Sequence, residues 1–154
     1  MREVHIADVS AKVINQLPKG AFITVKHGGK VNTMTIGWAT IGRVWNKPVM
    51  TTMVRYSRFT HEIIKEAESF TVSFSLDDSL KKALTVCGTK SGRDMDKFEE
   101  CGITPEYIPE VNSPYIAEGD LHIVCKVVYK QPMDPDMLTD EIKSDWYKDE
   151  DYHV

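Results

Sequence analysis

The sequence predicts a mainly β protein in which a β-barrel carries appended helices. Residues 21–54 hold three β-prone runs joined by short turns. Two further β-prone runs, 69–76 and 121–129, are separated from these by helical patterns that do not alternate regularly with strands. Regular alternation would have indicated a parallel βαβ sheet instead. Closing the strands into a barrel would also hide their edges from solvent.

The first β-prone runs form a predicted hairpin. Residues 1–20 are expected to be a short lead-in segment that ends in a turn at 17–20, where Pro and Gly occur together. The first strand is expected at 21–25. The Gly28-Gly29 pair predicts the hairpin turn because glycine accepts a positive φ without steric cost. The return strand is expected over 31–40.

A third strand is expected at 48–54, after which the hydrophobic period changes. The apolar spacing within residues 59–68 predicts an amphipathic helix, with Ser57 or Thr60 as its N-cap. Residues 69–76 then alternate polar and apolar side chains, which predicts a half-buried strand with one face in the core.

The second half of the chain mixes helices, turns and one long strand. In chain order we expect a helix from Asp77 to Gly88, a helix over 94–101, an extended loop or edge strand over 104–114, a long strand over 121–129 and a weak helix over 139–146. Gly102 is expected to end the second of these helices in the left-handed conformation that glycine favours.

Composition restricts the classes of partner. At 154 residues, one domain can bury about 70% of its unfolded surface. The net charge of −4 argues against nucleic acid or an anionic membrane as the main partner. No apolar run approaches the roughly 18 residues of a membrane span, and the N-terminus lacks the apolar core of a signal peptide. We therefore expect a cytoplasmic protein that binds neither nucleic acid nor membrane.

The reactive side chains do not form a familiar catalytic or metal motif. The three cysteines are widely spaced and odd in number, which argues against a disulfide framework. They are expected to be buried or half-buried free thiols, with a redox or acyl-transfer role as the alternative. The five histidines occur singly, so no metal site is expected. Neither a Gly-rich dinucleotide fingerprint nor a P-loop is present.

The strand-to-helix junction carries side chains suited to an anion. Arg55 and Arg58 supply guanidinium groups, Ser57 and Thr60 supply hydroxyls, and the predicted helix would supply free backbone N–H groups. This combination predicts a phosphate site, with helix capping and solvated arginines as the alternative. Residues 90–93 form a second basic cluster, which either approaches the same ligand or is a solvated turn.

The hydroxyl-rich strand before this junction suits a planar aromatic ligand. An isoalloxazine ring has a polar pyrimidine edge, which threonine hydroxyls and backbone N–H groups can bind. Its apolar dimethylbenzene edge suits Met34 and Trp38. The strand and the junction together indicate a flavin mononucleotide (FMN) type of ligand. An ordinary core strand with outward threonines remains the alternative.

Four blocks of sequence resemble the flavin reductase-like, FMN-binding split-barrel family, and most of all its flavoredoxin branch. The blocks, in chain order, are residues 32–38, 54–60, 70–74 and 87–98. The resemblance implies a six-stranded split barrel, a homodimer, and FMN bound near the dimer interface. The whole chain, 1–154, is expected to be a single flavin reductase-like split-barrel domain that lacks the family's final C-terminal strand and tail.

The resemblance also implies cofactor-binding residues, position by position. Those expected around the isoalloxazine ring are Asn32, Met34, Thr35, Ile36, Gly37 and Trp38. Those expected at the phosphate and ribityl chain are Arg55, Ser57, Arg58 and Thr60. Those expected to close the site, across the dimer interface, are Lys90, Ser91, Arg93 and Lys97.

The implied activity is that of an FMN-dependent oxidoreductase. Hydride from NADH or NADPH would reach the flavin, and electrons would pass to a small-molecule or protein acceptor. No side chain is expected to be catalytic, because the flavin carries the chemistry. A non-catalytic FMN-binding electron carrier or flavin store is the alternative, since nothing in the sequence marks a nicotinamide pocket. Pyridoxamine-phosphate oxidase chemistry, found on a related split barrel, fits the motifs poorly.

Overall fold

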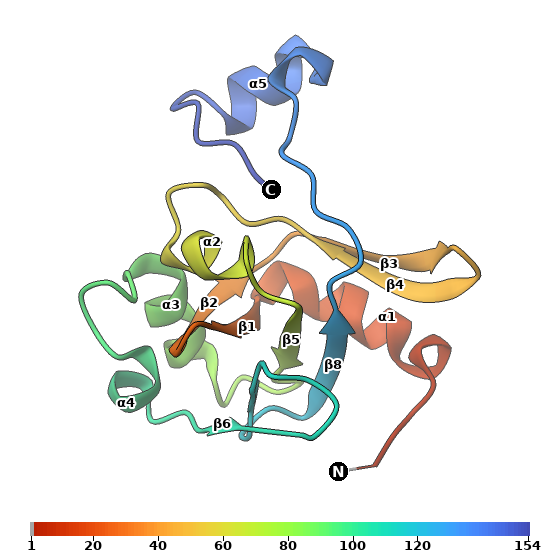
Figure 1. Ribbon diagram of the computed structural model, residues 1–154, viewed down its shortest axis with the longest axis vertical. Coiled ribbons are helices and arrows are strands. Elements are labelled where there is room, and N and C mark those ends of the chain that lie inside the picture. The colour runs from red at the N-terminus through yellow and green to blue at the C-terminus, as the bar shows by residue number, and fades with distance from the viewer. Residues whose placement is uncertain (1) are drawn as a thin grey trace.

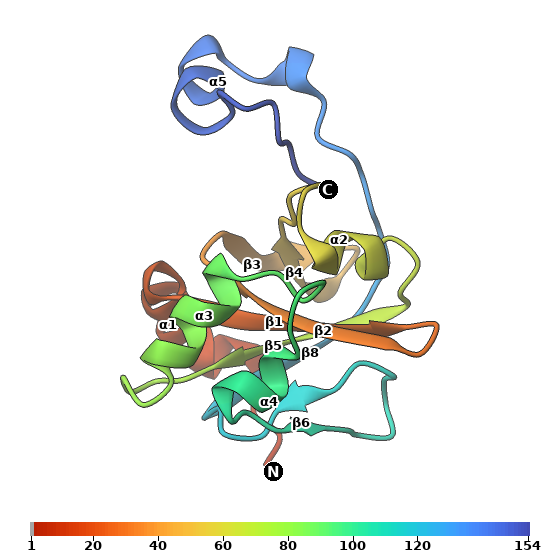
Figure 2. The same ribbon diagram turned by 90° about the vertical axis from the view of Figure 1, so that its left-hand side faces the viewer.

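A four-stranded antiparallel sheet lies at the centre of the computed structural model, which describes residues 2–154. Its strands, in spatial order, are β2 (Lys30–Ile36), β1 (Ala21–His27), β5 (Ser69–Phe74) and β8 (Leu121–Lys126). Figure 2 shows the other elements arranged on its two sides, with α2, β3 and β4 on one and α4 and β6 on the other. The strand β2 lies at the edge of this sheet.

Two short antiparallel ribbons complete the strands. They pair β3 (Ala39–Val44) with β4 (Lys47–Thr52), and β6 (Pro105–Glu106) with β7 (Tyr115–Ile116). The central sheet and the β3–β4 ribbon together hold the six strands of six or seven residues, as the six-stranded prediction requires. Within residues 2–154 they form separate hydrogen-bonded sheets, so the barrel is split and not closed. A mainly β architecture with appended helices is confirmed.

The turn predicted at 17–20 is confirmed, but most of the segment before it is a helix, which the sequence did not predict. The helix α1 (Ile6–Gln16) is capped by His5, whose Nδ1 accepts from the backbone N–H of Ala7 at 3.2 Å. It buries Val13 and Gln16. A single 3-10 turn, η1 (Leu17–Lys19), follows and ends at Gly20 with φ 105°.

The first hairpin is confirmed, but its return strand is shorter than expected. Gly28 and Gly29 form the turn with φ of 55° and 79°, which side-chain-bearing residues rarely adopt. The pairing with β1 ends at Ile36. The chain then leaves the sheet through Gly37 and Trp38 and begins β3. The predicted strand at 31–40 therefore covers nearly all of β2 and the first residues of β3.

The helix near the basic junction has no side-chain cap. The helix α2 (Phe59–Ile64) has Arg58 at its N-cap position, and no hydrogen bond from that side chain caps it in the described structure. The expected caps are engaged elsewhere, since Ser57 bonds to Asp151 and Thr60 accepts from Asn32. With six residues, α2 is also shorter than the predicted helix at 59–68.

The helices of the second half start later than predicted. The helix α3 (Lys81–Thr89) begins after Leu80, because the Asp77 carboxylate accepts the backbone N–H of Ser79 and caps only the preceding turn. This helix also continues through Gly88, where the sequence predicted its end. The helix α4 (Lys97–Cys101) begins after Asp96, whose side chain caps it.

Two predicted features of the later helices are confirmed. Gly102 follows α4 with φ 59°, the left-handed conformation expected of it. The weak helix is α5 (Asp140–Trp146), capped by the side chain of Thr139, and a 3-10 turn, η2 (Pro135–Met137), precedes it. No helix among residues 2–154 combines the length and apolarity needed to cross a membrane.

The central strand β5 is buried on both faces, which corrects the prediction of one exposed face. Its apolar face, Phe70, Val72 and Phe74, belongs to the larger apolar cluster of the core. Its polar face is covered by residues 113–116 through hydrogen bonds with each of its three hydroxyl-bearing residues, Ser69, Thr71 and Ser73. The shortest of these at each residue are Ser113 Oγ to the Ser69 carbonyl at 2.7 Å, Thr71 Oγ1 to the Pro114 carbonyl at 2.5 Å, and Ile116 N–H to Ser73 Oγ at 3.0 Å.

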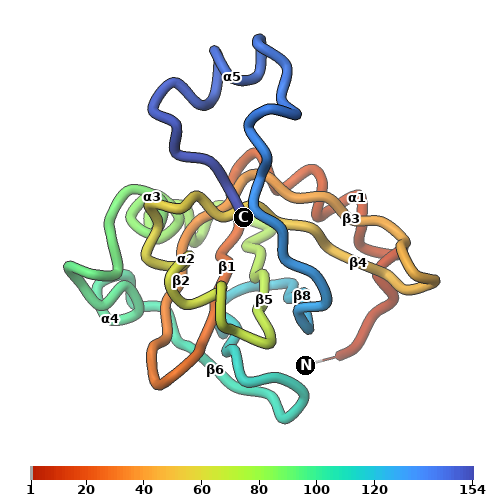
Figure 3. The backbone as a smooth tube through the Cα atoms, turned by 45° about the horizontal axis from the view of Figure 1, so that its top comes forward, coloured from red at the N-terminus to blue at the C-terminus, as the bar shows by residue number. Residues whose placement is uncertain are grey.

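The C-terminal segment leaves the body of the molecule and returns to it. After β8 the chain runs outward to α5, which stands away from the sheet in Figure 1. The last residues then lie beside the segment that follows β4, as Figure 3 shows. Val54 and Val154 exchange two backbone hydrogen bonds of 2.9 and 3.0 Å, and the N–H of Tyr56 donates to the Tyr152 carbonyl at 3.0 Å.

Candidate functional site

A cavity of about 120 Å³ lies at the free edge of β2. It forms where that strand meets α2 and the segment 89–97 that joins α3 to α4. The predicted site residues that line it are Asn32, Met34, Ser57, Arg58, Thr60, Lys90, Ser91, Arg93 and Lys97. The sequence analysis did not assign the remaining lining residues, which are Phe59, Thr89 and Gly92.

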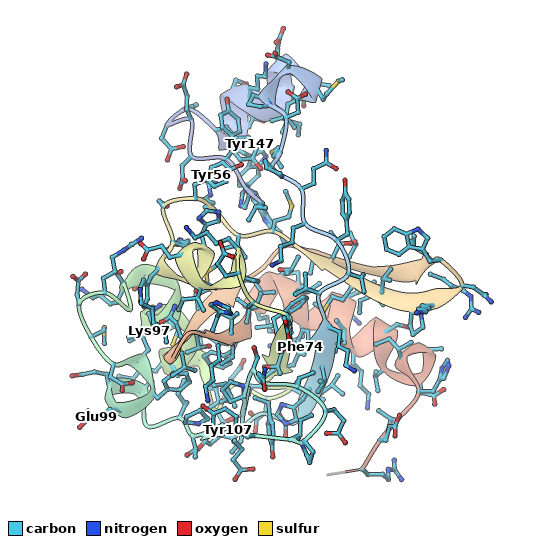
Figure 4. The ribbon with its side chains drawn as sticks, viewed as in Figure 1. Tyr56, Phe74, Lys97, Glu99, Tyr107 and Tyr147 are labelled. Atoms are coloured by element: carbon cyan, nitrogen blue, oxygen red, sulfur yellow. The ribbon has the colours of Figure 1, made fainter. Side chains whose placement is uncertain are left out.

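Lys97 is the most buried cation of the cavity, with 4% of its surface exposed. It is the first residue of α4, and its Nζ donates to the Thr33 carbonyl at 3.0 Å and the Cys87 carbonyl at 2.9 Å (Figure 4). Burial lowers the pKa of Lys97, and the positive charge of Arg58 acts in the same direction. Both acceptors are neutral, so these two hydrogen bonds leave the positive charge uncompensated.

Arg58 adds a second cation that bonds to a neutral group. Its Nη1 donates to the Gly88 carbonyl at 2.9 Å, which connects the start of α2 to the end of α3. No ion pair to Arg58 occurs among residues 2–154. The cavity therefore combines two cations that neutral carbonyls position without neutralising.

A hydrogen bond between buried side chains forms the floor of the site. Asn32 Nδ2 donates to Thr60 Oγ1 at 2.8 Å, and both residues are buried. The backbone of Gly92 packs directly against this pair, because a Cβ there would lie 2.1 Å from Asn32 Oδ1. In the structure the backbone of residues 90–93 thus approaches the Asn32 side chain, and its approach to a ligand stays a prediction.

The remaining predicted cation, Arg93, has a partner. Its Nε donates to Glu62 Oε1 at 2.9 Å, and its Nη1 donates to the Ser57 carbonyl at 3.1 Å. The bond from Arg93 lowers the pKa of Glu62. Arg93 therefore holds the 89–97 segment against α2 and contributes less free positive charge than Arg58 or Lys97.

Several predicted ring-binding residues do not line the cavity. Thr35 lies on the opposite face of β2 from Met34, because side chains alternate along a strand, and its Oγ1 donates to the Leu84 carbonyl at 2.6 Å. Ile36 is buried in the core. Gly37 and Trp38 lie beyond the end of β2, outside the cavity lining.

Trp38 instead packs on the C-terminal segment. Its ring lies edge-on to Trp146, with centroids 5.0 Å apart, and 5.5 Å from the ring of His153. Burial, with a smaller contribution from Arg55, lowers the pKa of His153 to about 4. The neutral imidazole bonds to the Tyr147 hydroxyl at 2.9 Å.

Arg55 also faces the C-terminal segment and does not line the cavity. It donates to the carbonyls of Asp151 at 3.1 Å and Trp146 at 3.0 Å, and its guanidinium lies over the Tyr147 ring. Figure 4 labels Tyr147 on this segment and Tyr56 on the chain that follows β4, and the Tyr56 N–H donates to the Tyr152 carbonyl. The predicted phosphate ligands are thus divided between the cavity and the C-terminal segment.

Asp151 binds the Ser57 donors that the sequence analysis assigned to a phosphate. Its Oδ1 accepts the Ser57 N–H at 3.0 Å and its Oδ2 accepts the Ser57 Oγ at 2.5 Å. The Arg55 guanidinium lies 4.0 Å from the same carboxylate and 3.6 Å from that of Asp149. A carboxylate therefore occupies part of the anion-binding junction. The acidic run 149–151 was the available sequence signal.

The sequence predicted that the N-terminus of a helix would contribute to a phosphate site. The helix α2 has six residues, too short for a strong macrodipole. Among residues 2–154, no group of three or more His, Cys, Asp or Glu side chains is arranged to hold a metal ion.

The fold and the site together define a split β protein with a cavity that basic side chains line at the edge of one strand. Comparison with known proteins identifies its family. The chain belongs to the flavin reductase like domain family, whose sequence profile matches residues 16–151. The family predicted from the four sequence blocks is therefore confirmed.

Solved structures agree with this assignment. The chain is similar to the flavoredoxin of Desulfovibrio vulgaris, with a TM-score of 0.67 and 23% identity over 79% of this chain and 73% of that one. It is similar to a flavoredoxin from Methanosarcina acetivorans, with a TM-score of 0.65 and 29% identity over 75% and 59%. A Shewanella frigidimarina protein with a split-barrel domain has a TM-score of 0.63 and 24% identity over 82% and 65%. The split-barrel fold is confirmed.

Proposed function

We propose that this chain binds FMN and passes electrons from NAD(P)H through FMN to a small-molecule or protein acceptor. Membership of the flavin reductase like domain family and similarity to two flavoredoxins support a flavin cofactor. The chain spans 59% of one of those flavoredoxins and 73% of the other, so the proposal concerns the part of the fold that they share.

The observation that best supports FMN binding is a pair of cations at the cavity, Lys97 and Arg58. Within residues 2–154, both bond only to neutral carbonyls. A buried cation is costly unless an anion or several hydrogen bonds compensate it. A phosphate group in the cavity would supply that negative charge. The two cations therefore support a ligand with an anionic end.

The residues fit the phosphate end of FMN, while the cavity is too small for the whole molecule. Its volume of about 120 Å³ falls below the ≈300–1,000 Å³ typical of sites for drug-sized ligands. We propose that Arg58 and Lys97 bind the phosphate and that Thr60 bonds the neighbouring polar chain. Met34 would contact the start of the ring, most of which would lie beyond the cavity.

When bound, FMN supplies the redox chemistry, because it accepts a hydride and releases electrons. The proposed roles of this chain's residues are to bind the cofactor, to orient it and to shield it from water. No side chain is proposed as a catalytic acid or base. Arg58 and Lys97 would provide the electrostatic contribution to binding, because their positive charges favour negative charge near them.

We also propose a homodimer, which exposed apolar side chains support. Trp45 and Tyr129 are 64% and 65% exposed and lie next to each other, with ring centroids 6.5 Å apart. Met137, near α5 on the projecting C-terminal segment, is 83% exposed. The exposed Trp45–Tyr129 pair is the kind of apolar surface found at interfaces, and Met137 is a separate exposed apolar side chain. Light scattering would show a dimer, and Trp45→Glu would shift it toward the monomer; a monomeric wild type would refute this part.

An FMN titration followed by flavin fluorescence tests the cofactor. The wild-type chain should quench the flavin saturably at close to one FMN per chain. Arg58→Ala should weaken FMN binding by about 10- to 100-fold, since a hydrogen bond to a charged group contributes about 1.5–3 kcal/mol. Arg43→Ala is the matched control, because Arg43 bonds to Asn46 in the β3–β4 turn and should leave the affinity unchanged. Equal affinities of wild type and Arg58→Ala would remove the phosphate assignment.

The non-catalytic carrier or flavin store remains the second candidate, because the cavity at β2, about 120 Å³, is too small for a dinucleotide. A second cavity, about 150 Å³, lies at the β1–β2 hairpin and is lined by Lys26, His27, Gly28, Glu68 and Asn112. Anaerobic mixing of the FMN-loaded chain with NADH or NADPH separates the two functions. Rapid bleaching of the flavin absorbance supports the oxidoreductase, and no bleaching supports the carrier.

A further inference from the structure

Two of the three cysteines lie in contact behind the cavity wall. Cys87 on α3 and Cys101 at the end of α4 have their sulfur atoms 3.9 Å apart, and both are free thiols. Cys87 is fully buried and packs with Phe22 and Leu84. Cys101 is partly exposed at the margin of the same cluster.

We propose that Cys87 and Cys101 form a reversible intramolecular disulfide, so that the pair is a redox modification site. A disulfide has an S–S length of about 2.05 Å, which the two sulfur atoms can reach from 3.9 Å by a modest movement. The movement has a place to occur, because α4 has only five residues and Gly102 follows it. The inference is independent of FMN binding.

The oxidant is a small-molecule disulfide such as oxidised glutathione, and exposure fixes the order of the steps. The Cys101 thiolate attacks one sulfur of the oxidant, which forms a mixed disulfide and releases one glutathione thiolate. Cys87 then attacks the Cys101 sulfur, which forms the internal bond and releases the second glutathione. Overall the two cysteines lose two electrons and two protons, and the oxidant takes them up as two thiols.

Burial explains why Cys87 takes the second step. Burial, followed by the neighbouring Cys101, raises the pKa of Cys87 to about 12, which makes it a poor first nucleophile. Lys97 acts in the opposite direction, since its charge favours the Cys87 thiolate. Once Cys101 carries the mixed disulfide, the attacking and attacked sulfurs are already neighbours, so proximity compensates for the small thiolate fraction.

The disulfide would close the part of the chain that carries the cavity's basic residues. Cys87 and Cys101 flank Lys90, Arg93 and Lys97, and the Cys87 carbonyl already accepts from Lys97 Nζ at 2.9 Å. Closing a loop of this length stabilises the folded state, with an expected rise in Tm of about 5–10 °C. The oxidised form should therefore hold the cavity wall more firmly than the reduced form.

The test treats the native full chain with oxidised glutathione, counts free thiols and measures the intact mass. The wild-type chain should fall from three free thiols to one, lose the mass of two hydrogens and retain no glutathione. Dithiothreitol should restore all three. Cys125→Ser should form the same internal bond and fall from two free thiols to none, because burial on β8 also raises the pKa of Cys125 to about 12 and no thiol contact to it is found among residues 2–154.

The single variants test the order of attack. Cys87→Ala should keep a stable glutathione adduct on Cys101, whereas Cys101→Ser should remain unmodified because Cys87 is buried. Three thiols left in the treated wild type, a lasting adduct, or a bond to Cys125 would each overturn the proposal. A fall in Tm on oxidation would overturn the claim that the native packing accommodates the bond. Because two variants and the wild type are read separately, misfolding of one variant leaves the test intact.

Discussion

A substitution of Asp151 offers the most direct test of whether the strand-to-helix junction binds an anionic ligand. The carboxylate of Asp151 occupies the Ser57 donors that such a ligand would use. Its two oxygens accept the N–H and the hydroxyl of Ser57 at 3.0 and 2.5 Å. The Arg55 guanidinium lies 4.0 Å away. Ser57 lines the cavity beside Arg58, so a phosphate bound by Arg58 and Lys97 gains the Ser57 donors only by displacing this carboxylate. Asp151→Asn should therefore increase the affinity for FMN.

The size of the increase follows from the contacts that the substitution removes. Hydrogen bonds to a charged group contribute about 1.5–3 kcal/mol, roughly twice the neutral value. Asparagine keeps one acceptor oxygen and no charge, so it loses part of both bonds. The Asp151 side chain is 19% exposed, so some of the loss is screened by water. A net change of about 1–2 kcal/mol remains, which corresponds to roughly 5- to 30-fold tighter binding.

Calorimetric titration of wild type and Asp151→Asn with FMN measures this change, and inorganic phosphate provides a second ligand without a ring. Asp149→Asn is the matched control. It removes the same charge from the same segment, and Asp149 faces Arg55 at 3.6 Å but makes no hydrogen bond to Ser57 within residues 2–154. Equal gains in both variants would mean a general effect of charge. Weaker binding by Asp151→Asn would refute the reasoning, because Asp151 would then be positioning Ser57 for the ligand.

Two further substitutions test the floor of the cavity and the C-terminal packing. Gly92→Ala places a Cβ 2.1 Å from Asn32 Oδ1 and should lower the free energy of unfolding by about 1–3 kcal/mol in urea titrations. Gly42→Ala, where nothing lies within 4 Å, is its control, and equal stabilities would contradict the packing argument. The pKa of His153 falls from 6.5 to about 4 on folding, so its contribution to stability is complete above pH 6.5 and is lost as the pH falls toward 4. His153→Gln should flatten the Tm profile across that range, and an unchanged profile would exclude His153 as its cause.

The features that were predictable from the sequence are governed by local sterics. The turn at Gly28 and the end of α4 at Gly102 both have a positive φ. Glycine adopts a positive φ more readily than other residues, so its presence in the sequence indicates such positions. The cap of α5 by Thr139 is likewise a local hydrogen bond. The helix α1 was missed because its cap is His5, an unusual type, and because its buried stripe includes the polar Gln16.

Some residues of the site were predictable from the sequence, and others were not. The four sequence blocks predicted that Asn32, Arg58 and Lys97 would come together, and the structure brings them to one cavity. The contacts of Arg55 and Trp38 with the C-terminal segment were not predictable, because Asp151 lies 96 residues from Arg55 and no local pattern connects them. That the cavity residues bind FMN stays a prediction.

The polar face of β5 strongly favours one register of that strand in the sheet. A shift of β5 by one residue would exchange its two faces, because side chains alternate along a strand. The rings of Phe70 and Phe74 would then press against the backbone of residues 113–116, and three hydroxyl-bearing side chains would enter the apolar cluster without partners. Each unpartnered hydroxyl costs about 1–3 kcal/mol. The buried hydroxyls therefore make a misaligned pairing of β5 less stable than the native pairing. A strand that is apolar on both faces would not distinguish the two pairings in this way.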